Sequence, residues 1–374
     1  MARGSIGLGK LVGIPIRVDL SWLFIVVWVT WSLASGYFPA RYPEWPETLS
    51  WGMGMLSSAL FFGSVLLHEM GHSLVARAQR LPVTDITLFI FGGASQIAEE
   101  PRNAREELLL AGAGPATSLG LAAAFGLTHL AVRSLSEPLG AVALFLAGIN
   151  LSLGLFNLIP GYPLDGGRVL RAILWGARRD VRWATRWASR TGRAVAGLFV
   201  LFGIYQASTG DWVSGLWVLF IGFFLDGASR SSYQQLTLRQ LLEGHVAAEI
   251  MAEDCQVIPP QLSVDTFVEH YLVGEGVRRC YVVGTRDELV GLLTPGDLQK
   301  VPRDRWMTTR VREVAMPVER LGVVAPDTPL WTALLQLTAE GVNQMPVLDR
   351  GQLVGMISRD RLLSLIRRLS ELDP

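Results

Sequence analysis

The chain lacks net charge, has few charged residues and contains almost no cysteine. Its 33 Lys and Arg residues balance 33 Asp and Glu residues, and this neutrality argues against a protein that binds nucleic acid. Only 18% of its 374 residues are charged, whereas a soluble domain averages about 25%. Two cysteines, Cys255 and Cys280, are too few for a disulfide framework or a cysteine-rich metal site. We expect both to be buried, reduced thiols in the cytosol.

Long apolar runs are present instead, all of them within residues 1–228. A membrane-spanning helix needs about 20 mostly apolar residues. Six segments approach that length, although the last two are short: 20–36, 52–76, 108–132, 139–159, 194–207 and 212–225. The first is not a cleaved signal peptide, because it begins too far into the chain and no small-residue cleavage site follows it. We therefore predict a polytopic α-helical membrane domain with six transmembrane helices.

Arginines set the expected orientation of these helices. Between residues 166 and 193 the only acid is Asp180, and the loops expected on the opposite side carry only Arg41 and Arg133. The arginines of this segment are Arg168, Arg171, Arg178, Arg179, Arg182, Arg186, Arg190 and Arg193. Because positive charge accumulates on the cytoplasmic side, we place residues 160–193, residues 77–107 and both termini in the cytoplasm.

Residues 82–98 have a different pattern from the helices. Ile86, Leu88 and Ile90 alternate with other residues, and Gly92 and Gly93 follow them. Period-two alternation punctuated by glycines predicts a β-hairpin or paired strands, here beside the membrane.

One apolar run contains ionisable residues, in the sequence His68-Glu69-Met70-Gly71-His72. On a helix, positions i and i+4 share a face, so both imidazoles can reach one metal ion while Glu69 acts as general base. Two histidines and a carboxylate are costly in an apolar segment unless they are paired, bind a metal or line water. We therefore predict a zinc site rather than histidines that only pack between helices.

A catalytic zinc site needs a third protein ligand and an open position for water. The other histidines lie on the wrong side or in the C-terminal part, and the glutamates at 99–107 are expected in a solvated loop. Asp165 differs, because it follows Pro160 and Pro163 at the cytoplasmic end of the fourth span. These prolines break the helix, and the glycines after Asp165 allow tight backbone that can return a carboxylate toward the metal. The alternative is an Asp that only caps the next segment.

The two motifs together resemble the site-2 protease family of intramembrane zinc metalloproteases. HEMGH is followed about a hundred residues later by NLIPGYPLDGG, which spans 157–167. Gly92-Gly93 after the strand-like stretch and Gly114-Pro115 early in the third span extend the resemblance, which covers residues 1 to about 228.

The resemblance implies roles for individual residues. His68, His72 and Asp165 would bind one Zn²⁺ per chain, and Glu69 would be the catalytic base. Asn157, together with Gly92 and Gly93, would contact the substrate or stabilise the intermediate. No residue of the catalytic motifs departs from the family pattern.

The resemblance also implies a substrate class and a place of action. It points to single-span membrane proteins, of the anti-sigma factor, pro-sigma factor or signal-peptide remnant type, cut near the cytoplasmic side of a prokaryotic plasma membrane. A cut helix must unwind, and pairing with a β-edge would replace its lost hydrogen bonds. We expect residues 88–95 to offer this edge, so Phe91→Pro should reduce cleavage while zinc stays bound.

The C-terminal part contains an internal repeat. Residues 275–298 (EGVRRCYVVGTRDELVGLLTPGDL) and 340–362 (EGVNQMPVLDRGQLVGMISRDRL) align with a shift of 64–65 residues and one gap. A helix–strand–strand–helix pattern fits both copies, and the repeat strengthens a resemblance to a tandem pair of CBS domains. We place a linker at 229–246 and the α/β CBS pair at 247–370, with copies at 247–300 and 310–370.

By resemblance, such pairs bind adenine nucleotides such as ATP or AMP and associate as homodimers. The Thr/Ser and Asp that contact ribose and phosphate are Thr294 and Asp297 in the first copy. The second copy has Ser358, but Arg361 stands at the Asp position and Asp360 lies one residue early. A CBS pair that only dimerises or packs on the membrane domain is the alternative.

Two other functions fit parts of the sequence. A transporter with a CBS gate would explain the membrane spans and the repeat, but it gives HEMGH and PLDGG no functional role. A metal-binding scaffold that presents membrane proteins without cutting them is the other. Glu69→Gln distinguishes these hypotheses, because only a protease would lose its activity while zinc stayed bound.

Overall fold

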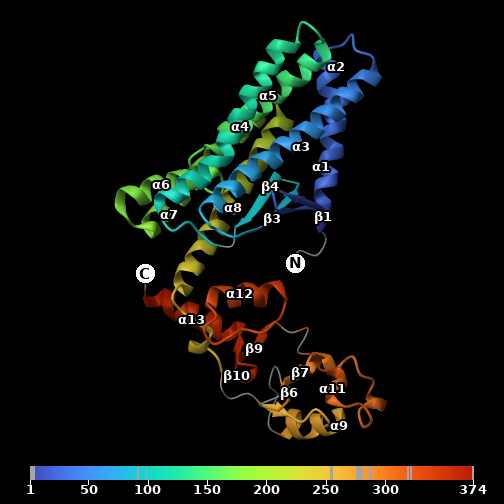
Figure 1. Cartoon of the computed structure of the whole chain (residues 1–374), viewed down its shortest axis with the longest axis vertical. Coiled ribbons are helices and arrows are strands. Elements are labelled where there is room, and N and C mark those ends of the chain that lie inside the picture. Colours follow the sequence, from blue (N-terminus) through green and yellow to red (C-terminus); the bar gives the residue numbers. More distant parts are fainter. Residues whose placement is uncertain are drawn as a thin grey trace. The chain divides into compact units, whose positions relative to one another are not determined.

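The computed structural model describes residues 5–90, 92–97, 99–252, 256–274, 281–285, 289–317, 320 and 322–372. The chain divides into two units, Ala2–Gln234 and Gln235–Pro374, and the division falls within one long helix, α8 (Figure 1). Three residues discussed above, Phe91, Cys255 and Cys280, lie outside the described residues.

Long apolar helices dominate the N-terminal unit. Five stretches of the described chain are long and apolar enough to cross a membrane: Leu20–Arg41 (α1, η1 and α2), Glu47–Ala78 (α3), Ala104–Val132 (α4), Glu137–Asn157 (α5) and Trp212–Leu242 (α8). The predicted span at 194–207 lies in α7 (Val181–Ser208), whose first half carries four arginines that leave too short an apolar stretch. A count of six spans therefore stays a prediction.

Helix α3 packs closely against its neighbours α4 and α5, and the three lie alongside one another (Figure 1). Its buried face is rich in small residues, including Gly54, Ser57 and Ser64. A Cβ on Gly71 would lie 2.5 Å from Thr117 Oγ1 of α4. Small residues of this kind let membrane helices approach each other closely, so α3 and α4 can place side chains in one shared site.

A four-stranded sheet lies beside α3, in the order β1–β2–β3–β4. The strands are Ser5–Leu11 (β1), Ile14–Asp19 (β2), Val83–Phe89 (β3) and Gly92–Ile97 (β4). The expected pairing at 82–98 is present as the antiparallel hairpin β3–β4, in which Ile86 pairs with Ser95 and Leu88 with Gly93. Strands β1 and β2 were not expected, and β2 pairs with β3 in parallel. Strand β4 therefore forms one edge of the sheet.

Two shorter helices follow the break after α5. Helix α6 (Asp165–Arg178) begins at Asp165, and α7 begins at Val181 behind the N-cap Asp180, whose side chain accepts a hydrogen bond from Trp183 N. The connection at 158–164 packs tightly, since a Cβ on Gly192 of α7 would overlap Tyr162 O. The helix break thus places Asp165 at the start of a new helix.

The C-terminal unit contains two small α/β layers. The first has a sheet of Val257–Ile258 (β5), Tyr281–Gly284 (β6), Leu289–Leu293 (β7) and Met316–Pro317 (β8), with helical segments Val264–Phe267 (α9), Val268–Gly274 (η3), Pro295–Leu298 (α10) and Val311–Val314 (α11). The second has Leu330–Ala339 (α12), Gln344–Asp349 (β9), Gln352–Ser358 (β10) and Arg359–Leu372 (α13). The helix–strand–strand–helix order expected for the repeat is clearest in this second layer.

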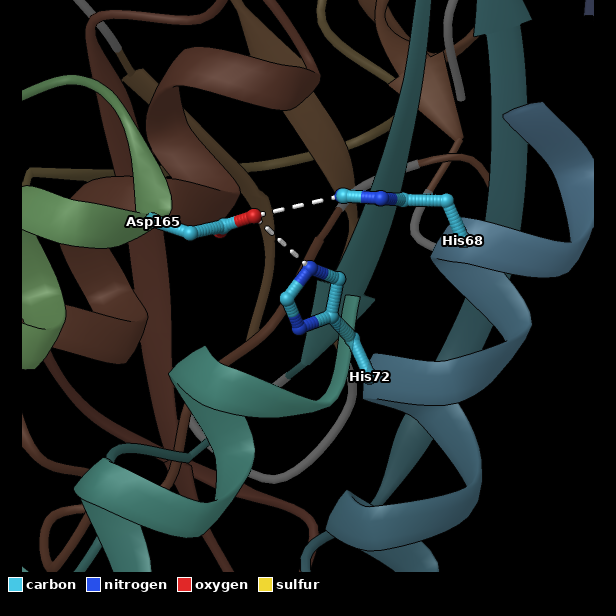
Figure 2. Close-up of side chains that lie close together, drawn as sticks. All are labelled: His68, His72 and Asp165. Carbon is cyan, nitrogen blue, oxygen red and sulfur yellow. Dashed lines mark hydrogen bonds and ion pairs between the residues drawn. The ribbon is translucent and has the colours of Figure 1, made fainter. Parts of the chain in front are cut away.

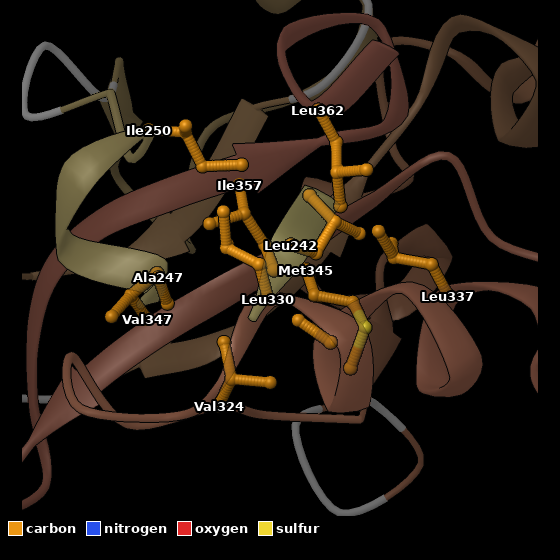
Figure 3. Close-up of a cluster of buried hydrophobic side chains, with 11 residues drawn as sticks. Leu242, Ala247, Ile250, Val324, Leu330, Leu337, Met345, Val347, Ile357 and Leu362 are labelled. Atoms are coloured by element: carbon orange, nitrogen blue, oxygen red, sulfur yellow. The ribbon is translucent and has the colours of Figure 1, made fainter. Parts of the chain in front are cut away.

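Each layer completes its core with residues that lie just before or at the start of the other copy. Leu242, Ala247 and Ile250 are buried with Leu330, Ile357 and other residues of the second layer (Figure 3). Ala252, near the start of the first copy, pairs with β10, just as β8, near the start of the second copy, pairs with β7. The two layers therefore exchange equivalent segments and form one intertwined pair.

Candidate metal centre

Two helices supply the three predicted ligands. His68 and His72 lie one turn apart on α3, and both are nearly buried, with 5% and 6% of their surface exposed. Asp165 is the first residue of α6. Its Oδ2 lies 3.2 Å from His68 Nε2 and 3.2 Å from His72 Nε2 (Figure 2). Among the described residues, this is the group of His, Cys, Asp and Glu side chains able to hold a metal ion.

Helix α4 orients both imidazoles from behind. His72 Nδ1 lies 2.7 Å from the backbone oxygen of Leu110, and His68 Nδ1 lies 2.8 Å from Ser118 Oγ. A carbonyl oxygen can only accept, so His72 Nδ1 carries the proton of this hydrogen bond. In the neutral ring the lone pair is then on Nε2, which points at Asp165.

The donor set fits a zinc ion. Lone pairs on imidazole nitrogens facing a carboxylate oxygen repel one another unless a proton or a cation lies between them. The two Nε2–Oδ2 distances of 3.2 Å match the edge of about 3.3 Å expected for tetrahedral zinc with bonds of about 2.0–2.1 Å. Each imidazole also has the partner on its other nitrogen that metal-binding histidines usually have.

Gly114 on α4 leaves the space that the two imidazoles occupy. A Cβ at this position would lie 2.5 Å from His68 Nε2 and would overlap His72 Nε2. Only glycine lets the α4 backbone approach the imidazole nitrogens this closely. The steric fit of the two imidazoles therefore explains why the Gly114-Pro115 pair has glycine as its first residue.

Glu69, the predicted base, is held by strand β4. Ser95 Oγ donates a hydrogen bond of 2.7 Å to Glu69 Oε2, and Ser95 Oγ also lies 3.2 Å from Ser73 Oγ. Gly93 lies against the Glu69 side chain, since a Cβ there would be 3.1 Å from Glu69 Cδ. The edge strand and the candidate base are thus in direct contact.

A cavity of about 440 Å³ opens onto these groups. His68, Glu69 and Asp165 line it together with Asn157, Gly92 and Gly93, so the structure brings together the residues predicted to contact substrate. The remaining lining is largely apolar: Ile25 and Val29 from α1, Phe61, Phe62 and Val65 from α3, Ile90, Leu153, Pro163 and Leu164. The amide of Asn157 donates one hydrogen bond, of 3.1 Å, to Leu153 O.

The predicted nucleotide residues of the first repeat are engaged with each other. Thr294 caps α10, and Asp297 Oδ2 accepts from both Thr294 N (3.0 Å) and Thr294 Oγ1 (2.6 Å). Asp297 Oδ1 accepts from Lys300 Nζ at 2.7 Å. Burial raises the pKa of Asp297, but the hydrogen bonds from Lys300 and Thr294 outweigh it and leave the pKa below its ordinary value.

The second repeat is arranged differently. Arg361, which stands at the Asp position, directs its Nη1 toward the backbone oxygens of Met251 (3.3 Å) and Ile250 (3.5 Å). Ser358 Oγ accepts a long hydrogen bond of 3.4 Å from Arg361 N, and the Asp360 carbonyl accepts from Ser364 Oγ. Arg361 therefore ties α13 to the exchanged segment.

Several residues that shape the metal centre were not found by sequence reasoning. Ser95, Ser118 and the carbonyl of Leu110 all hold a motif side chain by hydrogen bonds. Ser118 had one available signal, because it lies one helical turn after Gly114 and on the same face of α4. The contact of Ser95 with Glu69 depends on how β4 packs against α3, and no local sequence pattern predicts that packing.

Comparison with known proteins places these observations in context. The sequence matches Peptidase family M50 over residues 57–136 and 126–199, and the CBS domain over residues 246–304 and 311–368. "Putative zinc metalloprotease Rip3" of Mycobacterium tuberculosis is 34% identical over 378 residues, covering 100% of this chain and 96% of that protein. "Putative zinc metalloprotease sll0528" of Synechocystis is 32% identical, covering 98% and 96% respectively. The solved "Site-2 Protease from Methanocaldococcus jannaschii" is 26% identical, with a TM-score of 0.41, over 61% of this chain and 95% of that one.

Proposed function

This chain belongs to peptidase family M50 and is a zinc metalloprotease of the site-2 type, and we propose that it cleaves proteins within the membrane. The observation that carries the proposal is the convergence of His68, His72 and Asp165 beside a largely apolar cavity that is lined by His68, Asp165 and Glu69. His68, His72 and Asp165 would hold the zinc ion. The chemistry that a bound zinc ion supplies is that of a Lewis acid, which makes water acidic near pH 7 and polarises a carbonyl oxygen.

Glu69 performs the proton transfers. Its carboxylate accepts the proton of the attacking water and passes it to the amide nitrogen that leaves. The hydrogen bond from Ser95 to Oε2 fixes the carboxylate and leaves Oε1 for the water. Asn157 has one N–H engaged by Leu153 O, so the second N–H is available to donate to the scissile carbonyl oxygen as its negative charge grows.

The substrate binds as an extended strand on β4. This strand is an edge of the sheet, and Gly92 and Gly93 line the cavity. Backbone hydrogen bonds to the edge replace those that a substrate helix loses when it unwinds. The substrates are single-span membrane proteins of the anti-sigma factor, pro-sigma factor or signal-peptide remnant type.

The N-terminal unit crosses the plasma membrane of a prokaryotic cell with both termini in the cytoplasm. The five apolar helices and the arginines of α6 and α7 support this orientation. The apolar second half of α7, at 194–207, is the sixth span, which makes the number of crossings even. The metal centre then lies toward the cytoplasmic side, since Asp165 begins the arginine-rich α6.

The C-terminal unit responds to an adenine nucleotide and forms a homodimer. The protease domain is assigned to 1–228, the linker to 229–246 and the CBS pair to 247–370. The match to the CBS family and the Thr294–Asp297 arrangement support a nucleotide site in the first repeat. The engagement of Arg361 with backbone oxygens favours one nucleotide per chain rather than two.

The test compares Glu69→Gln with the wild-type protein on a single-span reporter substrate, at matched zinc content. Glu99→Gln is the control, because Glu99 is exposed and does not line the cavity, whereas Glu69 does. We expect Glu69→Gln to keep zinc and lose cleavage, while Glu99→Gln cleaves as the wild type does. Equal cleavage by both variants would contradict the assignment of Glu69. A wild-type protein that binds zinc but cuts no substrate, with or without nucleotide, would favour a scaffold.

A further inference from the structure

A deeply buried ion pair of the N-terminal unit has no role in the proton transfers above. Glu107 on α4 is fully buried, and Arg171 on α6 is 2% exposed. Arg171 donates to Glu107 Oε1 through Nε at 2.5 Å and contacts the same oxygen through Nη2. Arg168 Nε lies 3.9 Å from Glu107 Oε1, and Glu100 Oε2 lies 3.8 Å from Arg171 Nη1.

The ion pair is poorly designed for stability alone. Within the described part of the chain, Glu107 Oε2, Arg171 Nη1 and the hydroxyl of Tyr162 are buried without a hydrogen-bond partner. The Arg171 guanidinium lies 5.9 Å from the Tyr162 ring centroid, so these atoms belong to one cluster. A buried ion pair with unsatisfied atoms is often no more stable than apolar residues of the same volume. The contribution of this ion pair therefore lies in the geometry that it imposes on α4 and α6.

That geometry concerns the third metal ligand. On α4, Glu107, Leu110, Gly114 and Ser118 share one buried stripe, and the last three shape the imidazole site. On α6, Arg171 follows Asp165 by six residues, or about 9 Å of helix, while Glu107 precedes Gly114 by seven residues, or about 10 Å. The two intervals match if α4 and α6 run antiparallel.

A third contact agrees with this antiparallel register. A Cβ on Gly176 of α6 would lie 3.5 Å from Ala104 Cβ, at the start of α4. Successive positions along α6 therefore lie beside earlier positions along α4: Asp165 and Gly114 both adjoin the imidazole nitrogens, Arg171 pairs with Glu107, and Gly176 lies against Ala104. A slide or rotation of α6 on α4 would break the Glu107–Arg171 pair and also displace Asp165.

We propose that Glu107 and Arg171, the α4–α6 clamp, are positioning residues that set where the Asp165 carboxylate meets the two imidazoles. The clamp works through the fork of two guanidinium N–H groups, Nε and Nη2, which converge on one oxygen of Glu107 and so fix direction as well as distance. It acts on zinc affinity rather than on the proton transfers. The inference rests on the proposed zinc function, which the experiment tests separately.

The experiment measures metal binding by the full-length protein in detergent micelles. Metal-free protein is titrated with Zn²⁺ against a competing chelator, and with Co²⁺, whose absorption spectrum reports the coordination geometry. The main variant is the double substitution Glu107→Met plus Arg171→Met, which keeps the volume and removes both charges. Arg230→Met is the control, because Arg230 forms an ion pair with Asp226 on α8 at 2.8 Å.

We expect the double variant to unfold near the wild-type temperature without metal, yet to bind Zn²⁺ at least about tenfold more weakly and to show an altered Co²⁺ spectrum. Arg230→Met should match the wild type in both. A double variant with the wild-type dissociation constant and spectrum would overturn the clamp. If it does not fold, Arg171→Lys decides, because lysine keeps the charge but not the fork: weaker Zn²⁺ binding supports the clamp and unchanged binding overturns it. Wild-type protein that binds no Zn²⁺ would instead overturn the proposed function.

Discussion

Replacing Gly114 by alanine sets helix propensity against the geometry of the metal centre. In the interior of a helix this change ordinarily stabilises a protein by about 0.5–1 kcal/mol. Here the new Cβ would lie 2.5 Å from His68 Nε2 and would overlap His72 Nε2, whereas an ordinary contact is 3.4–4 Å. Relief of the His68 contact alone requires a shift of about 0.9 Å, several times the tolerance of about 0.2 Å on a metal–ligand distance.

We therefore expect Gly114→Ala to weaken zinc binding at least about 100-fold, because loss of a mere outer-shell partner already costs about 10–100-fold. The assay is the zinc dissociation constant of the full-length protein, with thermal unfolding of the metal-free form beside it. The matched control is Gly112→Ala on the same helix, where a Cβ would meet nothing within 4 Å. It should gain stability and keep wild-type zinc affinity. Wild-type zinc affinity in Gly114→Ala would refute the arrangement of the centre described here.

Two further predictions concern the base and the C-terminal unit. Ser95→Ala removes the 2.7 Å hydrogen bond to Glu69. Because a hydrogen bond to a charged group contributes about 1.5–3 kcal/mol, kcat should fall about 10–100-fold, while KM and zinc content stay unchanged. Ser95→Thr should restore part of the lost kcat. A fall in zinc content equal to the fall in kcat would show that Ser95 supports the fold instead. Thr294→Val should reduce the increase in unfolding temperature that ATP or AMP produces, whereas Ser358→Ala should leave it unchanged; equal effects of both would contradict a single site in the first repeat.

Sequence periodicity was sufficient for the parts of the site that lie on one helix. His68, Glu69 and His72 needed only the i, i+4 rule, and Asp165 needed the helix break made by two prolines. The hairpin at 82–98 followed from alternation over a short range. For the histidines and the hairpin the pattern and the contact lie within a few residues of each other, whereas Asp165 lies 97 residues from His68 and its role as a ligand was also implied by the resemblance of the two motifs.

Contacts between distant segments could not be predicted in the same way. The pairing of β2 with β3 joins Ile16 to Ile86, and no feature of either strand specifies the other. The alignment of the two repeats identified equivalent segments, but equivalence does not say that Ile250 completes the core of the second layer. The fifth predicted span is not among the five apolar helices because arginines occupy the first half of α7, and hydropathy alone does not decide whether such a helix crosses the membrane or lies at the interface.

The recognisable motifs and the residues that align them lie on different elements. The motif side chains come from α3 and α6, whereas α4 orients both imidazoles through Leu110 and Ser118 and makes room for them at Gly114. Strand β4 holds Glu69 through Ser95. A chain can therefore retain HEMGH and PLDGG and still lose activity through a change in α4 or β4. Zinc content separates the two cases, because a change in α4 should remove zinc and a change at Ser95 should not.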